Sequence, residues 1–310
     1  MNVRRTTVAV TGATVSVLEW TPGRTGLGDG LDLGDGLGDG DGDGPTVLLL
    51  HGGGADSAEL SWGEVGPALA KAGFRVLAPD HPGFGRSPRA EWPLTQEHLV
   101  RYVGELVDAL DLDDYVVGGL SLGGGLTLGH LLDRPGRARG AMLMGCFGIM
   151  PRLADGPLGR LSHAATFLLL RSGLLAAMTR SYARDPAAME RGLRDIVRNP
   201  SARTPELVRA VIAEAAASDG LEVFGQWQRE QVLWGRLRTD YTDRLHEIEA
   251  PTLLVHGDHD RGVPIARARS AARLLPRSEL LEVPDAGHWV QRDRPDLVIP
   301  AMVGFLRRVG

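Results

Sequence analysis

The sequence predicts an α/β protein with a mostly parallel, eight-stranded sheet flanked by helices and with an inserted helical lid. Short apolar, β-branched runs alternate with segments of helical periodicity, which is typical of buried parallel strands joined by helices. From residue 147 to about residue 249 the strand pattern stops and only helical periodicity remains. We therefore expect residues 1–146 and 250–310 to form the two parts of one core, with the lid at 147–249 between them.

The composition indicates a globular protein of the intracellular type. A chain of 310 residues with 43% hydrophobic residues is long enough to bury one large core. The single cysteine, Cys146, excludes an internal disulfide and fits a reducing compartment. Residues 1–20 lack a continuous apolar segment of signal-peptide length, and no other run approaches the ~20 residues of a membrane span. We expect a soluble, cytoplasmic protein with no membrane partner.

The net charge of −5 comes from one low-complexity tract. Residues 23–44 hold six aspartates, one arginine and many glycines, and the charges of the remaining chain balance. There is accordingly no basic face for nucleic acid. Repeated Asp-Gly binds calcium in β-roll proteins, but the regular nonapeptide period and the apolar position of those repeats are missing here. We expect a flexible loop without a metal site.

Before the lid, the pattern predicts an edge hairpin followed by buried strands and helices. Residues 6–10 and 14–20 alternate polar and apolar side chains around a short turn, as the strands of an antiparallel hairpin do. The buried strands that follow are expected at residues 46–50, 74–79, 115–117 and 141–145. Helices are expected at residues 61–72 and 95–110, the second with Thr95 as its N-cap.

The lid and the closing part of the chain follow the same rules. Within the lid, residues 161–178 are strongly apolar, residues 186–197 are amphipathic, and residues 204–217 begin with a threonine cap, a proline and an acid. After the lid the α/β alternation returns. Strands are expected at residues 251–256 and 278–283, and helices at residues 265–275 and 295–308.

One glycine-rich turn holds the first candidate for chemistry. The strand that begins at residue 115 runs into Gly119-Leu120-Ser121-Leu122-Gly123, and helical spacing resumes at residues 126–132. Glycines two before and two after the serine avoid collisions with the neighbouring strand and helix. Such a turn pushes the Ser121 hydroxyl out of the sheet and aims the amides of the helix N-terminus at negative charge beside it. Taken alone, the motif also fits a plain turn or a dinucleotide loop.

A nucleophilic serine needs a histidine base and an acid that orients it, and two later loops contain them. Asp260 follows the strand predicted at residues 251–256, and His288 follows the strand predicted at residues 278–283. The chain order serine, acid, histidine, each at the carboxyl end of a parallel strand, is that of a nucleophile turn served by later loops. Asp258 is the rival for the acid.

The same loop raises a second interpretation, a metal site. His256 and His259 stand beside Asp258 and Asp260. Neighbours in one turn cannot all converge on one ion, and the triad already accounts for Asp260. We therefore expect no metal here.

The run His51-Gly52-Gly53-Gly54 ends the strand predicted at residues 46–50. Backbone without side chains at the carboxyl end of a central strand can approach a ligand closely, which an oxyanion donor requires.

Together these pieces resemble the α/β-hydrolase fold family over essentially the whole chain apart from the Gly/Asp tract. The matching pieces are His51-Gly52-Gly53-Gly54, Asp80-x-Pro82-Gly83-x-Gly85-x-Ser87, Gly119-x-Ser121-x-Gly123, Gly257-x-x-Asp260-x-x-x-Pro264 and Gly287-His288. The resemblance implies Ser121 as nucleophile, His288 as base and Asp260 as orienting acid. It also implies an oxyanion hole made by the backbone N–H groups of Gly53 and Leu122.

Within that family, the chain is most similar to the meta-cleavage-product hydrolases, which break carbon–carbon bonds in dienoic diketo acids. The glycine run at residues 52–54, the lid phrase at residues 199–207 and His288-Trp289 look like theirs. Two positions differ. Leu120 stands where those enzymes have asparagine, and Val211 stands where they have the lid arginine that binds the substrate carboxylate, with Arg209 two positions away.

Without that arginine a charged substrate loses its anchor, because an unpaired charge in an apolar pocket is costly. The sequence therefore favours a serine hydrolase that cleaves an ester, thioester or lactone of a largely apolar small molecule through an acyl-enzyme. Carbon–carbon bond hydrolysis is the alternative. Non-catalytic ligand binding, or a recruited non-hydrolytic step on the same fold, is the alternative of another class. No cofactor is required.

The expected substrate contacts come from the core loops and the lid. From the core we expect Gly52, Gly54, Leu120, Phe147 and Trp289. The large apolar lid residues either pack within the lid or face the nucleophile and accept an apolar group; they are Phe167, Leu168, Leu169, Leu174, Leu175, Met178, Phe224, Trp227 and Trp234. The partner is a small-molecule substrate, and the sequence leaves open whether the chain forms a homo-oligomer.

Overall fold

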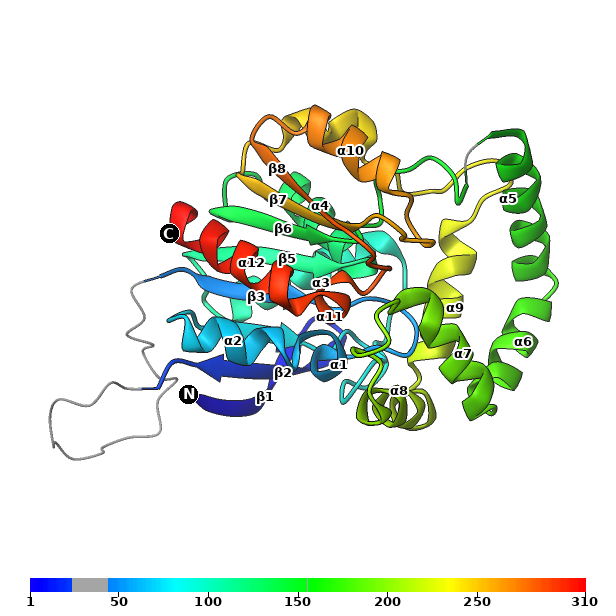
Figure 1. The fold of residues 1–310 in the computed structure, drawn as a ribbon, viewed down its shortest axis with the longest axis horizontal. Helices are drawn as coiled ribbons and strands as arrows, with labels where there is room; N and C mark the ends of the chain where they lie inside the picture. Colours follow the sequence, from blue (N-terminus) through cyan, green and yellow to red (C-terminus); the bar gives the residue numbers. More distant parts are fainter. Residues whose placement is uncertain (24–43, 155) are drawn as a thin grey trace, which may run out of the picture.

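Eight strands form one sheet in the computed structural model, which describes residues 1–23, 44–154 and 156–310 (Figure 1). The strand order is β1-β2-β4-β3-β5-β6-β7-β8. An antiparallel hairpin of β1 (Asn2–Val10) and β2 (Ala13–Thr21) forms one edge, and β2 pairs antiparallel with β4. The remaining neighbours pair in parallel: β3 (Thr46–Leu50), β4 (Val76–Pro79), β5 (Tyr115–Leu120), β6 (Gly140–Met144), β7 (Thr252–Gly257) and β8 (Ser278–Val283). The predicted fold class is confirmed.

Helices cover both faces of this sheet. On one face α3 (Gln96–Ala109), α4 (Leu122–Asp133) and α10 (Ile265–Leu274) bury their apolar residues in one core cluster. On the other face α1 (Ala58–Trp62), α2 (Val65–Lys71), α11 (Val290–Asp293) and α12 (Pro295–Val309) share a second cluster. The Thr95 side chain caps α3 by accepting from the His98 amide, as the sequence predicts.

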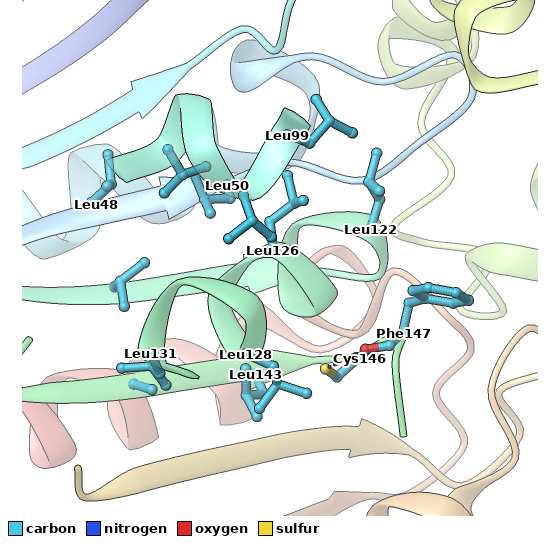
Figure 2. Packing of buried hydrophobic residues seen from close by; sticks show 14 of the residues in the cluster. Leu48, Leu50, Leu99, Leu122, Leu126, Leu128, Leu131, Leu143, Cys146 and Phe147 are labelled. Carbon is cyan, nitrogen blue, oxygen red and sulfur yellow. Dashed lines mark hydrogen bonds between the residues drawn. The ribbon is translucent and has the colours of Figure 1, made fainter. Parts of the chain in front are cut away.

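The first cluster fixes α4 against the sheet. Leu50 at the end of β3 and Leu126 of α4 are fully buried, and Figure 2 shows them side by side. Leu143 of β6 belongs to the same cluster, and Phe147 lies at its outer end. Each fully buried leucine contributes roughly 1.5–3 kcal/mol of stability. The turn that precedes α4 therefore stands on a well-packed support.

The segment between β6 and β7 is helical and lies beside the carboxyl ends of the strands (Figure 1). Its helices are α5 (Gly156–Arg171), α6 (Leu174–Ala183), α7 (Pro186–Ile196), α8 (Pro205–Ala217) and α9 (Gly220–Gln231), followed by the 3₁₀ helix η1 (Thr242–Glu247). Trp227 of α9 joins the core cluster of α4, whereas Leu193 of α7 and Val211 of α8 join the cluster of α12. The segment is thus packed against the core at two places.

One predicted helix is wrong as a continuous element, and one apolar stretch after β6 forms two helices. The helix expected at residues 61–72 is divided into α1 and α2, with Gly63 as the C-cap of α1. The apolar stretch at residues 161–178 is divided into α5 and α6, which meet at a bend of 82°. Gly173 caps α6 with a φ of 74°, a left-handed conformation that glycine adopts without a steric penalty.

Several large apolar side chains of the lid are exposed. Leu168, Leu174, Met178 and Trp234 are each more than half exposed, so neither the lid-core nor the pocket interpretation fits them. Among the described residues no single helix is long and apolar enough to cross a membrane, although α5 and α6 taken together have the length and composition for it. The loop predicted at residues 23–44 lies, apart from its two end residues, outside the described residues.

Candidate active site

The turn between β5 and α4 holds Ser121 in a strained conformation. Its φ of 52° and ψ of −112° lie in a region that a residue with a side chain rarely adopts, at a cost of about 1–3 kcal/mol. Hydrogen bonds hold the residue there: the Ser121 amide donates to the Met144 carbonyl at 2.9 Å, and the Ser121 carbonyl accepts from the Phe147 amide at 3.0 Å. The side chain therefore stands at the end of the sheet.

Two glycines make this turn sterically allowed. A side chain on Gly119 would place its Cβ 2.2 Å from the backbone carbon of Gly123. A side chain on Gly123 would place its Cβ 2.1 Å from the carbonyl oxygen of Leu50. Both contacts are with backbone that cannot move aside, so the requirement for glycine that the sequence motif implies has a direct cause in the structure.

Asp260 and His288 come together in the structure. His288 Nδ1 donates to Asp260 Oδ2 at 2.8 Å. The rival acid, Asp258, instead accepts from the ring of its exposed neighbour His259 at 2.7 Å. Of the two candidate acids, Asp260 is thus the one that contacts the candidate base.

Asp260 is held as a buried carboxylate. Its Oδ1 accepts from the amides of Gly262 at 2.7 Å and Val263 at 2.9 Å. Its Oδ2 lies 3.3 Å from His256 Nε2, whose N–H also donates to the Val263 carbonyl. Burial raises the pKa of Asp260, but the charges and hydrogen bonds of His288 and His256 lower it more, so the carboxyl pKa lies well below its usual range.

Two glycines leave space for the imidazole of His288. A Cβ on Gly145 would lie 3.1 Å from His288 Nδ1, and a Cβ on Gly262 would lie 3.2 Å from the same atom. The side chain of His288 is 14% exposed, so it stays accessible to a substrate. Among the described residues the Ser121 hydroxyl has no hydrogen-bond partner, so the contact expected between nucleophile and base is not formed in this structure. Such contacts are often long in a free enzyme and tighten when substrate is held.

The two amides expected to form the oxyanion hole donate no hydrogen bond within the described residues, and α9 lies against one of the two residues, Gly53. Neither the Gly53 nor the Leu122 amide donates to another described residue. Leu122 is the first residue of α4, where helical amides have no partner within the helix. A Cβ on Gly53 would lie 2.2 Å from the ring of Phe224, so α9 places an aromatic ring directly on this loop.

Phe224 belongs to an aromatic cluster. Its ring stacks on Trp227 with centroids 5.4 Å apart, and Trp227 meets Phe147 edge to face at 4.8 Å. The Trp227 indole N–H donates to the Gln96 side chain at 3.2 Å. The expected contact residue Phe147 is therefore part of an aromatic cluster. Through Phe224 this cluster contacts the loop at residues 51–54, here called the oxyanion loop.

The other expected contact residues lie in different surroundings. Leu120 is fully buried and approaches Gly52 from within the core, and Trp289 is buried in the same core cluster. The Gly52 amide is used by a core side chain, Asp56. Gly54 has a φ of 92° with open space where a Cβ would be. Of these four, Gly54 alone faces open space.

Asp56 fixes the oxyanion loop from inside the protein. This fully buried side chain accepts from the Gly52 amide at 2.8 Å, the Ser57 amide at 2.8 Å and the Ser61 hydroxyl at 2.7 Å. Burial raises its pKa, while those three hydrogen bonds and the charge of Arg292 lower it, and the net result is a pKa of about 7. The position of Gly53 thus depends on a carboxyl group that titrates near neutral pH.

Two buried histidines fix the other end of the same loop. His51 Nδ1 donates to the Gly52 carbonyl at 2.7 Å, and its Nε2 accepts from the His81 amide at 2.9 Å. His81 Nε2 donates to the His51 carbonyl at 3.1 Å, and its Nδ1 accepts from the Tyr102 hydroxyl. These partners assign both rings as neutral, and burial lowers the pKa of His51 to about 3.

Asp293 ties the lid to the loop that contains His288. Its Oδ2 accepts from the Gly287 and Arg198 amides, and its Oδ1 accepts from the Asn199 amide at 2.7 Å. The Trp289 amide donates to the Ile196 carbonyl at 2.8 Å. The lid segment after α7 therefore runs directly beside the histidine loop.

Sequence reasoning missed Asp56, Asp293 and the contact of Phe224 with Gly53. An aspartate two residues after the glycine run, in a stretch that is otherwise apolar and small, was a signal for Asp56. No local signal exists for the position of Phe224, because it depends on how α9 packs against a loop far away in the chain.

The chain belongs to the α/β-hydrolase fold family, which it matches over residues 45–295. The family recognised from the sequence is confirmed, and the protein is an enzyme of this hydrolase class. It is 29% identical over 270 residues to 2-hydroxy-6-oxo-6-(2'-aminophenyl)hexa-2,4-dienoic acid hydrolase from Metapseudomonas resinovorans, with 86% of this chain and 85% of that protein covered. It is 29% identical over 274 residues to 2-hydroxy-6-oxo-6-phenylhexa-2,4-dienoate hydrolase from Burkholderia cepacia, with 85% and 88% covered.

A solved structure of a meta-cleavage product hydrolase from Pseudomonas fluorescens has a similar fold. The TM-score is 0.76 at 22% sequence identity, with 98% of each chain covered. At this identity the likeness shows the fold alone.

The first prediction separates the two candidate acids. In Asp260→Asn the amides of Gly262 and Val263 keep the amide oxygen in place, so the NH₂ group faces His288 Nδ1 and forces the wrong tautomer of the base. We expect kcat to fall roughly 10³- to 10⁴-fold. The matched control, Asp258→Asn, should change kcat less than about twofold, since Asp258 contacts an exposed histidine and the backbone at Asp285 and Ala286 rather than the ring of His288. Steady-state kinetics on any turned-over substrate measures both, and the reverse ranking would give the role to Asp258.

The second prediction concerns the pH dependence of stability. The pKa of Asp56 in the folded protein, about 7, lies above its ordinary value of 3.8. The folded state therefore binds this proton more tightly, and the resulting stability is full below the ordinary pKa and is lost as pH rises through about 7. The Asp56→Asn variant has no titrating group at this position, so this contribution to the pH dependence of stability is missing from it.

Between about pH 5 and about pH 8, the free energy of unfolding of the wild type should fall relative to that of Asp56→Asn by roughly 2–3 kcal/mol. Urea unfolding at several pH values measures it. The asparagine leaves one backbone N–H unpaired, which lowers the free energy of unfolding of the variant by an amount that does not change with pH. The test is therefore how the difference in free energy of unfolding between wild type and variant changes with pH. A difference that stays constant with pH would contradict the assignment.

Proposed function

We propose that this hydrolase cleaves a carbon–carbon bond in a hydroxy-oxo-dienoic acid through an acyl-enzyme on Ser121. The observation that carries the proposal is the likeness over about 85% of the chain to relatives named for dienoate hydrolysis, combined with the Asp260–His288 pair. The sequence by itself favours ester cleavage, and the relatives move our preference to its alternative. Both reactions use the same nucleophile, base and oxyanion donors.

The proposed roles follow from the atoms available. His288 takes the Ser121 proton as the hydroxyl oxygen adds to the ketone carbon C6, and the amides of Gly53 and Leu122 stabilise the oxyanion. When the adduct collapses, the C5–C6 bond breaks, and in the keto tautomer its electron pair passes through the C3=C4 double bond to the C2 oxygen. The proton on His288 returns to this fragment. Water activated by His288 then hydrolyses the acyl-Ser121 ester, so one water and one substrate give two acids.

The carboxylate of the substrate needs a positively charged side chain as its partner. Neither residue 211 nor residue 209 supplies one. Val211 is apolar and lies buried with Leu193 in the core cluster of α12. Arg209 is 68% exposed and pairs with Glu206 at 2.7 Å. The alternative in which the nearby Arg209 replaces the missing lid arginine therefore has no support in the structure.

Arg198 is the candidate anchor that we propose instead. Its backbone amide and that of Gly287, the neighbour of His288, donate to the same oxygen of Asp293. Its Nε is buried and has no hydrogen-bond partner among the described residues. A buried N–H left without an acceptor costs about 1–3 kcal/mol, and more for a charged group. A bound carboxylate would supply the missing acceptor.

A matched pair of substrates tests the proposal. 2-Hydroxy-6-oxo-6-phenylhexa-2,4-dienoate and 4-nitrophenyl benzoate both give benzoyl-Ser121, but only the first carries a carboxylate. We expect benzoate and 2-hydroxypenta-2,4-dienoate from the dienoate. Arg198→Gln should raise its KM at least about tenfold, as expected for a lost charged hydrogen bond. The same variant should change kcat/KM for the ester less than about twofold, and Arg209→Gln should affect neither substrate.

Two outcomes would change the proposal. If the wild type cleaves the dienoate and Arg198→Gln cleaves it equally well, carbon–carbon cleavage stands, but Arg198 is not the residue that binds the substrate carboxylate. No cleavage of the dienoate, together with efficient hydrolysis of the ester, would reject the proposal. Ester hydrolysis is the second candidate, favoured by the buried Val211 and by Leu120, which offer no charged group to a substrate.

A further inference from the structure

A cavity lies among the helices between β6 and β7. It has a volume of about 410 Å³ and is lined by residues of α5, α6, α8 and α9 together with the short α8–α9 connection. None of Ser121, Asp260 and His288 lines it. Its size falls within the range of small-molecule sites, roughly 300–1,000 Å³. In Figure 1, α9 lies between the sheet and the outer pair α5 and α6.

The walls of this lid cavity combine apolar and cationic groups. The apolar surface comes from Leu170, Leu175, Leu221 and alanines. Four charged residues complete it: Arg180, Asp219, Glu222 and Arg229. An apolar wall with a few polar groups is the usual form of a site that binds an amphiphilic ligand.

With Arg89 of the core included, three arginines stand against two acids, which leaves one positive charge in excess. Both acids share Arg89 as their ion-pair partner, at 2.6 Å to Asp219 and 2.8 Å to Glu222. Arg180 and Arg229 form no hydrogen bond or ion pair within the part of the chain that the structure describes. Both arginines are exposed at the rim of the cavity, where an anion that comes from outside can reach them, and a guanidinium is well suited to a carboxylate.

The cavity and the loop that contains Gly53 contact neighbouring residues of the same helix, α9. Gly225 lines the cavity and has open space where a Cβ would be. Its neighbour Phe224 lies on Gly53. A ligand in the cavity thus packs against the helix that covers the oxyanion hole.

We propose that the lid cavity is a second binding site, which takes a monocarboxylate with a medium-length apolar chain. The apolar chain lies against Leu170, Leu175 and Leu221, and the carboxylate binds Arg180 and Arg229. The inference is independent of the reaction at Ser121, because it rests on the cavity and on its unpaired cations alone.

Sodium octanoate is the probe, and titration calorimetry on Ser121→Ala is the measurement, so that no turnover interferes. Relative to that background, adding Arg180→Gln and Arg229→Gln together should raise the Kd for octanoate at least about tenfold. Gly225→Leu should abolish binding, because the new side chain fills the cavity without strain. Arg171→Gln, which removes an arginine of α5 that does not line the cavity, is the matched control and should leave the Kd unchanged.

Two further arms locate the ligand and define its chemistry. 1-Octanol should bind more weakly than octanoate and should not respond to the arginine substitutions. Wild type whose active site is blocked by a fluorophosphonate should bind octanoate as the unblocked protein does. The proposal is overturned if octanoate binds the double arginine variant or Gly225→Leu with unchanged Kd, if octanol binds as tightly as octanoate, or if blocking the active site removes binding.

Discussion

The close approach of Gly123 to the carbonyl oxygen of Leu50 is the constraint on which the site depends. A Cβ at Gly123 would lie 2.1 Å from that oxygen, so only glycine lets the first turn of α4 run against the end of β3. This approach brings the free amide of Leu122 to the loop that contains Gly53. It also forces Ser121 into its left-handed conformation, with φ at 52°. The strain is supported by the buried leucines between α4 and the sheet, so Ser121 and the amides of Gly53 and Leu122 share one rigid support.

Buried carboxylates join the remaining parts of the site by accepting backbone amides. Asp260 orders its own loop through Gly262 and Val263 while it orients His288. Asp56 holds the Gly52 amide, and Asp293 accepts from both the histidine loop and the lid segment at Arg198. The segment after α7 is therefore hydrogen-bonded to the histidine loop, and α9 contacts the loop that contains Gly53 through Phe224. The inserted helical segment thus contacts the candidate site at two points.

The sequence was sufficient for the sheet and for placing Asp260, rather than Asp258, beside His288, because both depend on periodicity and on loops that follow parallel strands. The catalytic roles of Ser121, Asp260 and His288 stay predictions. It was insufficient where packing across the chain decides. The ring of Phe224 on Gly53, the burial of Asp56 and the exposure of Leu168 and Met178 follow from how the lid helices meet the core. The bend between α5 and α6 had a local signal, Gly173, which the apolar pattern around it obscured.

Labelling with a fluorophosphonate probe, followed by peptide mass spectrometry, tests the central claim most directly. The account predicts one adduct, on Ser121, which disappears in Ser121→Ala and forms much more slowly in His288→Ala. The second variant matters because Ser121 and His288 are not hydrogen-bonded in this structure, so slow labelling would show that the base reaches the nucleophile during the reaction. An adduct on another residue, or equal labelling of the wild type and Ser121→Ala, would contradict the assignment of Ser121 as the nucleophile.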